Sequence, residues 1–249
     1  MTSKCIYINE VESTNLWLRS YKSSAGEDLT FVWTDFQTAG RGCGRNTWES
    51  EDGKNLIFSV LCHPRQVSAR QQFILSMANA LALKDTLDSY LGEVKIKWPN
   101  DIYWQDKKIC GTLIETVLHG NEIKDCILGT GINVNQQAFR SQAPNPVSMC
   151  QILGHEVNRE DLLAKVREHL EEYLEMVDDG MWESLRANYR QALYRLQETH
   201  PFRLPDGRVV SCKVMGVDDD GHILLLPEPG QAVDTRPIRF AFKEVQFII

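Results

Sequence analysis

The chain has 249 residues, of which 43% are hydrophobic and 24% are charged, and its formal net charge is −7 at pH 7. This composition predicts a globular protein with a large core, and the excess of acidic residues argues against general nucleic-acid binding, which usually needs a basic face. The apolar runs are too short to span a bilayer, so no membrane association is expected. Seven scattered cysteines without a C-x-x-C pair, and an N-terminus without a signal-peptide pattern, favour a reducing, cytoplasmic location.

The elements expected in the first half alternate between helices and strands. In chain order they are a short helix after Ser13, a strand over 29–37, a strand over 55–62, a helix over 68–91, a strand over 94–98, and a hairpin whose strands cover 108–118 and 122–135. Ser13 is a good N-cap residue, and Ser68 with Gln71 has the spacing of a capping box. The strands are apolar or alternating runs, and Gly120 marks the turn of the hairpin.

The second half of the chain changes in composition near residue 198. A helix beginning at Asn158 carries one apolar stripe, which is typical of an amphipathic helix lying on a core. A further helical segment is expected over 182–197. Beyond it, short strands are separated by Asp-Gly, Pro and Gly turns, which indicates a small β-barrel. The sequence therefore predicts an α+β main domain over residues 1–197 and an all-β domain over residues 198–249.

A segment rich in glycine and arginine, FQTAGRGCGRNTWES, lies between the first two expected strands. Gly40, Gly42 and Gly44 would let backbone N–H groups approach an anion closely. Arg41 and Arg45 supply guanidinium groups that suit a phosphate or a carboxylate. The segment matches neither a Walker A loop nor the dinucleotide-binding fingerprint. A flexible connection is the alternative, although such a turn needs neither three glycines nor two arginines.

Two lysine-containing segments follow. In KIKWPNDIYW the proline favours an extended or turned backbone, so Asn100 and Asp101 would sit at a strand end and could face a ligand beside Lys97. A solvated Asn-Asp turn is the alternative. In DKKICGTLIET, Gly111 interrupts an apolar run behind Lys108, and such a glycine often marks the close approach of a ligand or another backbone. A β-bulge with exposed lysines is the alternative there.

Two further segments combine small and polar residues. In LGTGINVN, Gly129 and Gly131 share one face of a strand, where they remove side chains and leave room for another group, and Asn133 follows them. A twisted strand that accommodates a neighbouring side chain is the alternative. Near the N-terminus, ESTN brings together the small hydrogen-bonding side chains of residues 13–15. Taken alone, these three residues read as a helix cap.

In this order the motifs E-S-T-N, Q-T-A-G-R-G…W, K-W-P-N-D, K-K-I-C-G and G-T-G-I-N-V-N resemble those of biotin protein ligases. The resemblance implies a mixed or antiparallel sheet flanked by helices, the class II aminoacyl-tRNA-synthetase-like fold of biotin and lipoate ligases, plus a small C-terminal SH3-like β-barrel. It also implies a two-step reaction. Biotin and ATP, normally with Mg²⁺, give biotinyl-5′-AMP, and a lysine of a biotin carboxyl carrier protein then attacks this mixed anhydride.

The resemblance also implies roles for individual residues. Biotin would be contacted by Ser13, Thr14, Asn15, Gln37, Gly40, Arg41, Gly42, Cys43, Lys108, Gly111 and Gly129. ATP and the adenylate would be contacted by Arg41, Arg45, Trp48, Lys97, Asn100, Asp101, Lys108 and Asn133. The catalytic residues would be Arg41, Lys97, Asp101 and Lys108. The cations would neutralise the two anions that meet, and Asp101 would orient or deprotonate the incoming lysine. No metal ligand is identified.

The chain departs from the family pattern in the glycine-rich segment. Where many relatives carry an arginine after Gly-Arg-Gly, this chain has Cys43, followed by Gly44 and Arg45. Two alternatives stay open: Arg45 replaces the missing charge, or the segment holds the adenylate less tightly. The first motif begins near residue 10, which leaves no room for the helix-turn-helix domain of some relatives, so no DNA binding is expected. Both a monomer and a homodimer fit the sequence.

Two other functions remain as alternatives. A lipoate or octanoate ligase or transferase shares the fold and a related lysine, and Cys110 could suggest an acyl-cysteine transferase. K-W-P-N-D and G-R-G favour biotin, however, and a cysteine inside an apolar strand usually serves packing. A non-catalytic binding module would be expected to lack charges at the phosphate-facing positions, whereas Arg41, Lys97, Asp101 and Lys108 are all present.

Overall fold

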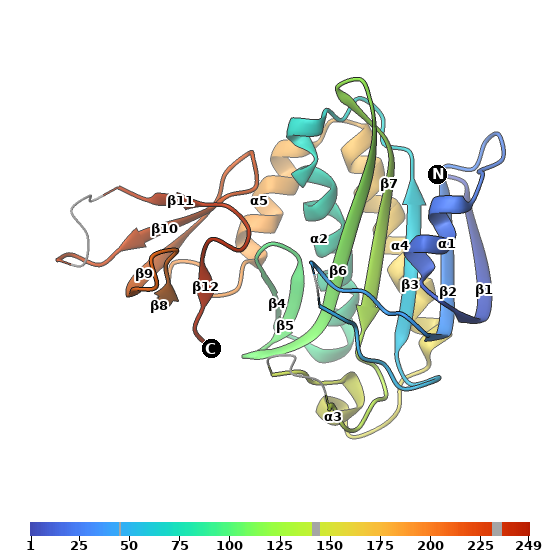
Figure 1. Cartoon of the computed structure of the whole chain (residues 1–249), viewed down its shortest axis with the longest axis horizontal. Coiled ribbons are helices and arrows are strands. Elements are labelled where there is room, and N and C mark those ends of the chain that lie inside the picture. Colours follow the sequence, from blue (N-terminus) through green and yellow to red (C-terminus); the bar gives the residue numbers. More distant parts are fainter. Residues whose placement is uncertain (45, 141–144, 231–235) are drawn as a thin grey trace.

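The computed structural model describes residues 1–44, 46–140, 145–230 and 236–249 of the chain. Its largest element is a seven-stranded sheet in the order β1-β2-β3-β7-β6-β5-β4 (Figure 1). The strands are β1 (Ser3–Val11), β2 (Leu29–Gln37), β3 (Leu56–Cys62), β4 (Val94–Lys97), β5 (Asp101–Trp104), β6 (Lys107–His119) and β7 (Glu122–Ile132). β1 runs parallel to β2, and the other neighbouring strands are antiparallel. The predicted mixed sheet is confirmed.

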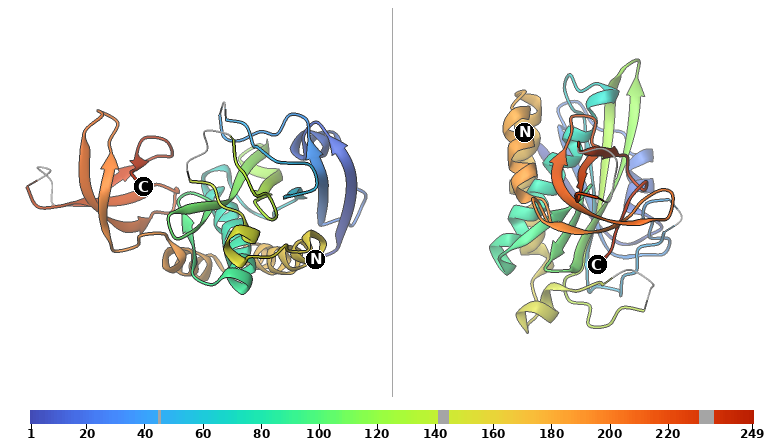
Figure 2. Two further views of the ribbon diagram at one scale, coloured as in Figure 1. Left: turned by 90° about the horizontal axis from the view of Figure 1, so that it is seen from below. Right: turned by 90° about the vertical axis from the view of Figure 1, so that its left-hand side faces the viewer.

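Helices cover both faces of this sheet (Figures 1 and 2). They are α1 (Thr14–Ser20), α2 (Phe73–Leu91), α3 (Met149–Leu153), α4 (Arg159–Asp178) and α5 (Trp182–Ala192). α2 contacts β4 and β5 as well as α4 and α5, and the main core lies between these helices and the sheet. Leu18 of α1 packs against Val32 and Ile127 on the opposite face. Phe31, next to Val32, belongs to the main core, because side chains alternate across a strand.

The predicted amphipathic helix is confirmed as α4. The side chain of Asn158 accepts hydrogen bonds from the backbone N–H groups of Glu160 and Asp161, which caps the first turn. The predicted apolar stripe is buried, and it consists of Leu162, Val166, Leu170, Tyr173, Leu174 and Val177. Packing of this stripe therefore fixes the helix against α2 and the main core, as the 3.6-residue period indicates.

Two expected helices have different bounds in the structure, and β1, β5 and α3 were not expected. α2 begins at Phe73, because the capping box closes a separate 3₁₀ turn just before it. α5 ends at Ala192 and does not continue to residue 197, because the chain turns to meet β4, where Tyr194 N–H donates to the carbonyl of Ile96 at 2.9 Å. β1 was not expected, since this edge strand is mostly exposed and lacks a run of buried apolar residues.

A second, small antiparallel sheet lies at the C-terminal end, in the order β11-β10-β9-β8-β12. Its strands are β8 (Thr199–Arg203), β9 (Val209–Val217), β10 (Ile223–Pro227), β11 (Ile238–Phe240) and β12 (Gln246–Phe247). It packs on the main sheet through Trp98, whose indole N–H donates to the carbonyl of Gly221 at 2.9 Å. All its strands follow residue 198, which supports our proposed division there. None of the described helices is both long and apolar enough to cross a membrane.

Candidate active site

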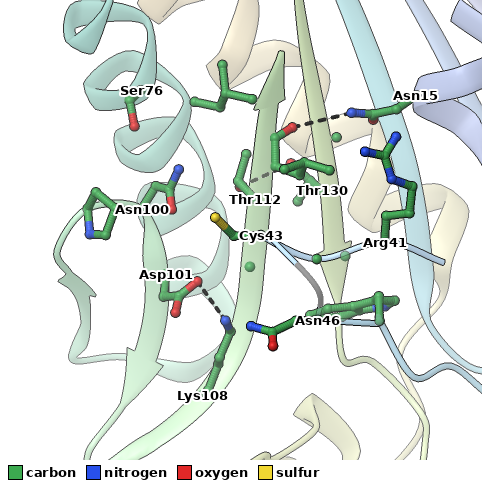
Figure 3. Close-up of a pocket in the computed structure, with 18 of the residues that line it drawn as sticks. Asn15, Arg41, Cys43, Asn46, Ser76, Asn100, Asp101, Lys108, Thr112 and Thr130 are labelled. Carbon is green, nitrogen blue, oxygen red and sulfur yellow. Dashed lines mark hydrogen bonds and ion pairs between the residues drawn. The ribbon is translucent and has the colours of Figure 1, made fainter. Parts of the chain in front are cut away.

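A cavity of about 870 Å³ lies over the face of the sheet that carries α1 (Figure 3). This volume is in the range of small-molecule and cofactor sites. Of the predicted site residues, the cavity is lined by Ser13, Thr14, Asn15, Gln37, Arg41, Gly42, Cys43, Trp48, Lys97, Asn100, Asp101, Lys108, Gly111, Gly129 and Asn133. Gly40 is not among the lining residues, and Arg45 lies outside the described residues.

The floor of the cavity is made of glycines from two neighbouring strands. Gly111 of β6 pairs with Gly131 of β7, and Gly129 points to the same face two residues earlier. A Cβ atom built on Gly131 would lie 2.2 Å from the indole ring of Trp48, and one on Gly129 would lie 1.9 Å from Oδ1 of Asn15. These glycines therefore make room for side chains that cross over the sheet.

One end of the cavity is rich in neutral hydrogen-bonding groups; we call it the uncharged end, although the ion pair of Arg41 with Glu115 lies beside it. Oε1 of Gln37 accepts hydrogen bonds from the backbone N–H of Thr14 at 2.8 Å and from its hydroxyl at 3.0 Å. Ser59 of β3 lies 2.6 Å from the hydroxyl of Thr14 and donates to Oδ1 of Asn15 at 2.6 Å. Ser13 holds the N-cap position, but its side chain makes no capping hydrogen bond. Its hydroxyl is therefore not used to cap the helix.

Two residues of this end were not predicted from the sequence. Ser59 is fully buried in an otherwise apolar strand, and its polarity there was the signal available. Glu115 of β6 accepts from Nδ2 of Asn15 at 3.0 Å and pairs with Arg19 at 2.6 Å and with Arg41 at 3.6 Å. Its position on the same strand face as Gly111 was the corresponding signal. Both residues act on side chains that do line the cavity.

The other end of the cavity is charged. Nζ of Lys108 lies 2.7 Å from Oδ1 of Asp101, and each side chain is only about a quarter exposed. The backbone of Lys108 is held on both sides, because its N–H donates to the carbonyl of Asn145 at 2.8 Å and its carbonyl accepts from Val147 at 3.0 Å. Gly111 lies beneath, since a Cβ there would approach Nζ of Lys108 to 2.9 Å. A positioned ammonium group is the result.

Lys97 brings a second ammonium group to this end, in a different environment. Its Nζ lies 5.2 Å from the ring centre of Tyr103 and 4.9 Å from that of Phe247, which belongs to the C-terminal sheet. Burial lowers the pKa of Lys97, and the attraction of Asp101 offsets this only in part. The small sheet therefore helps to hold this lysine in the cavity wall.

Replacing Lys97 by methionine is expected to raise the melting temperature at pH 7. A lysine pKa below its unfolded value means that the charged form costs stability at neutral pH. Methionine keeps the contacts with the two rings. Because the cost disappears as the pH rises through the lowered pKa toward 10.5, the gain should shrink on going from pH 7 to pH 10. Thermal unfolding at both pH values measures it; a variant that is less stable at pH 7 would contradict the prediction.

The two asparagines predicted near the nucleotide have different surroundings. The side chain of Asn133 donates to the carbonyl of Val147 at 3.2 Å and to that of Lys108 at 3.4 Å, so it holds the segment that positions the lysine. Asn100 lines the cavity beside Asp101 (Figure 3). Nε1 of Trp48 is buried over the glycine floor without a hydrogen-bond partner among the described residues.

The C-terminal sheet completes the wall at the charged end. Its contributions are Asp220, Gly221, His222, Ala241 and Phe242, which the sequence did not indicate because they lie far along the chain from the motifs. Asp218, Asp220 and His222 bring possible metal-ligand atoms within 4.8 Å of one another. Arg239 pairs with Asp218 at 2.6 Å and with Asp220 at 3.1 Å, and thus already neutralises these carboxylates.

A mixed sheet with a small antiparallel C-terminal sheet, and one cavity that joins an uncharged polar end to a cationic end, define the class of biotin and lipoate ligases. Residues 7–133, slightly more than half of the 249-residue chain, match the model of the Biotin/lipoate A/B protein ligase family. The chain belongs to this family.

Curated proteins and solved structures give the same result. Over 241 residues the chain is 27% identical to the bifunctional ligase/repressor BirA of Bacillus spizizenii, covering 92% of this chain and 71% of the relative. It is 29% identical over 205 residues to the biotin–[acetyl-CoA-carboxylase] ligase of Paracoccus denitrificans, covering 79% and 84%. The biotin protein ligase of Aquifex aeolicus, solved in complex with biotin and ATP, superimposes with a TM-score of 0.79 at 26% identity and covers 98% of this chain and 99% of its own.

Proposed function

We propose that this chain is a biotin protein ligase that activates biotin with ATP and transfers it to a lysine of a biotin carboxyl carrier protein. First, a carboxylate oxygen of biotin attacks the α-phosphorus of ATP, and pyrophosphate leaves. The amine of the acceptor lysine then attacks the acyl carbon of biotinyl-5′-AMP, AMP leaves, and the amine loses a proton. The names of the Paracoccus and Aquifex relatives, and the biotin and ATP in the Aquifex structure, support this proposal.

The observation that carries the proposal is the polarity of the cavity from end to end. Asn15, at the uncharged end, and Lys108, at the charged end, lie on opposite sides of the space drawn in Figure 3. Biotin has the same division, with a neutral ureido ring at one end and a carboxylate at the other. Its ring N–H and C=O groups need partners once buried, whereas its carboxylate must meet a phosphate and needs positive charge.

At the uncharged end, we assign the ureido ring to the hydroxyls and amides of α1 and the end of β2. These are Ser13, Thr14, Asn15 and Gln37, of which the last three are held in position by hydrogen bonds among Thr14, Gln37, Ser59 and Asn15. The ring and the valeryl chain would pass over the side chains that cross the glycine floor, because Asn15 and Lys108 already occupy the space directly above Gly129 and Gly111. Gly42 and Cys43 also line the cavity.

At the charged end, we assign Lys108 to the carboxylate and then to the oxygens of the acyl phosphate. Lys97 would add positive charge as pyrophosphate leaves, and Arg41, whose guanidinium lies beside Asn15 in Figure 3, would have to turn toward this end to do the same. Asp101 would keep the ammonium of Lys108 in place through its 2.7 Å contact and help to orient the incoming amine. Trp48 is assigned to the adenine, and Asn100 and Asn133 to the surroundings of the phosphates and ribose.

Magnesium is expected to enter with ATP. This ion usually keeps several waters and takes one or two protein oxygens besides those of the phosphates. The carboxylate of Asp101 and the amide oxygen of Asn100 fit that requirement, because both line the charged end of the cavity. When bound, the ion would neutralise phosphate charge.

The acceptor, the location and the assembly are also proposals. The name of the Paracoccus relative supports a carboxylase carrier protein as the acceptor. All seven cysteines are free thiols, which supports a reducing, cytoplasmic location. We further propose that the chain does not bind DNA and acts as a monomer or a homodimer.

ATP–pyrophosphate exchange tests the function directly. Exchange that depends on biotin and is absent with lipoate or octanoate is the expected result. Exchange with lipoate alone would replace the proposal by a lipoate ligase, and exchange with neither acid would favour a binding module. Biotin transfer to a purified carrier domain then tests the second step separately.

A further inference from the structure

Glu115 is the carboxylate on which three side chains from two parts of the chain converge. Its Oε2 accepts from Asn15 at 3.0 Å, and its Oε1 pairs with Arg19 at 2.6 Å and with Arg41 at 3.6 Å. Asn15 and Arg19 belong to α1, whereas Arg41 comes from the glycine-rich segment. The Glu115 side chain is only 16% exposed, and the residue is not among those that line the cavity. It therefore acts through the residues it holds.

The position of Arg41 is the second observation. Its guanidinium lies beside Asn15 and points away from Lys108 and Asp101, at the far side of the cavity (Figure 3). The anionic groups of the substrates are assigned to the Lys108 end. For Arg41 to serve them, its guanidinium has to give up the contact with Glu115.

From this geometry we propose that Glu115 is a positioning residue that acts as an internal counter-ion for Arg41. The proposal rests on the function given above and adds a regulation of that site. While the cavity holds no anion, Glu115 keeps Arg41 at the uncharged end. The carboxylate of biotin or the phosphate of ATP then competes with Glu115 for the same guanidinium. Arg19 shares Oε1 of Glu115 with Arg41 and therefore weakens the hold on Arg41.

This competition gives two variants of opposite sign. Glu115→Gln keeps an oxygen that accepts from Asn15 but removes the charge that holds Arg41. Arg19→Gln leaves the Glu115 charge and removes the other cation, so that Arg41 is held more strongly. Partly exposed ion pairs of this kind correspond to about two- to fivefold in affinity.

The test is isothermal titration of each purified variant with biotin and with biotinamide, its neutral analogue. Glu115→Gln is expected to bind biotin about two- to fivefold more tightly, and Arg19→Gln about two- to fivefold more weakly. Both should bind biotinamide within twofold of the parent protein. Glu122→Gln, which removes an exposed charge from the same hairpin, is the matched control and should change neither ligand.

The outcomes separate this inference from the function on which it depends. If Glu115→Gln weakens biotin and biotinamide equally, Glu115 only supports the structure around Asn15 and the inference is wrong. It is also wrong if both variants shift biotin affinity in the same direction. If the parent protein binds neither ligand, the proposed function itself fails, whatever the variants do.

Discussion

Replacing Lys108 by glutamine is expected to lower the kcat/KM of biotin-dependent ATP–pyrophosphate exchange by about a hundredfold to a thousandfold. The first step brings a carboxylate against a triphosphate, and Lys108 is the ammonium that its backbone hydrogen bonds and Asp101 fix at the charged end of the cavity. Glutamine is one atom shorter and still polar, but it supplies no charge. The loss should therefore fall mainly on kcat, since the charge that builds up on the α-phosphate is greatest in the transition state.

Two variants control this measurement. Lys107→Gln removes the neighbouring charge on the opposite, exposed side of β6 and should leave exchange unchanged. Lys108→Arg keeps a cation but not the compact ammonium that fits against Asp101, so it should recover only part of the lost activity. Exchange within about fivefold of the parent protein for Lys108→Gln would show that this lysine does not neutralise the reacting anions.

Much of the fold follows from local patterns in the sequence. The apolar period predicts the stripe of α4, and the turn residues predict the hairpin of β6 and β7. The structure has both at the expected positions. β1 was not predicted, because an edge strand with only one neighbouring strand buries little apolar surface and leaves no apolar pattern. The end of α5 was predicted wrongly for a different reason. The helix stops where the backbone N–H of Tyr194 donates to Ile96, about a hundred residues away in sequence. Local helix propensity does not predict such a long-range contact.

The candidate site also contains contacts that local sequence patterns do not predict. The motif residues were recognisable because each motif is continuous in the chain. Glu115 and Ser59 matter through partners such as Asn15 of α1, and the packing of this helix against β3 and β6 could not be read from the sequence. Phe247 of the C-terminal sheet contacts Lys97, and no residue spacing within the main domain predicts this contact. Most of the residues predicted from the motifs line the cavity, and the structure adds Ser59 and Glu115, which hold some of them in place.

Replacing Gly129 by alanine is expected to lower the free energy of unfolding by about 1–3 kcal/mol, the usual cost of forcing extra volume into a packed site. The new Cβ would lie 1.9 Å from Oδ1 and 2.9 Å from Nδ2 of Asn15. Asn15 is only 4% exposed, and hydrogen bonds to Ser59 and Glu115 hold it from two sides, so it cannot rotate away without losing them. Urea unfolding measures the stability, and titration with biotin should show at least about a tenfold loss of affinity.

The sign of the stability change distinguishes a fixed Asn15 side chain from a movable one. In an ordinary strand, alanine is more favourable than glycine, so Gly129→Ala would stabilise the protein if Asn15 were free to move. The matched control is the Asn15→Ala background, in which the obstructing amide is absent and Gly129→Ala should cost nothing further or be slightly favourable. A cost that stays the same in both backgrounds would mean that the backbone itself requires glycine. A cost that vanishes with Asn15 would mean that Gly129 is required only because the amide crosses the sheet at that point, which ties the glycine floor to the uncharged end of the cavity.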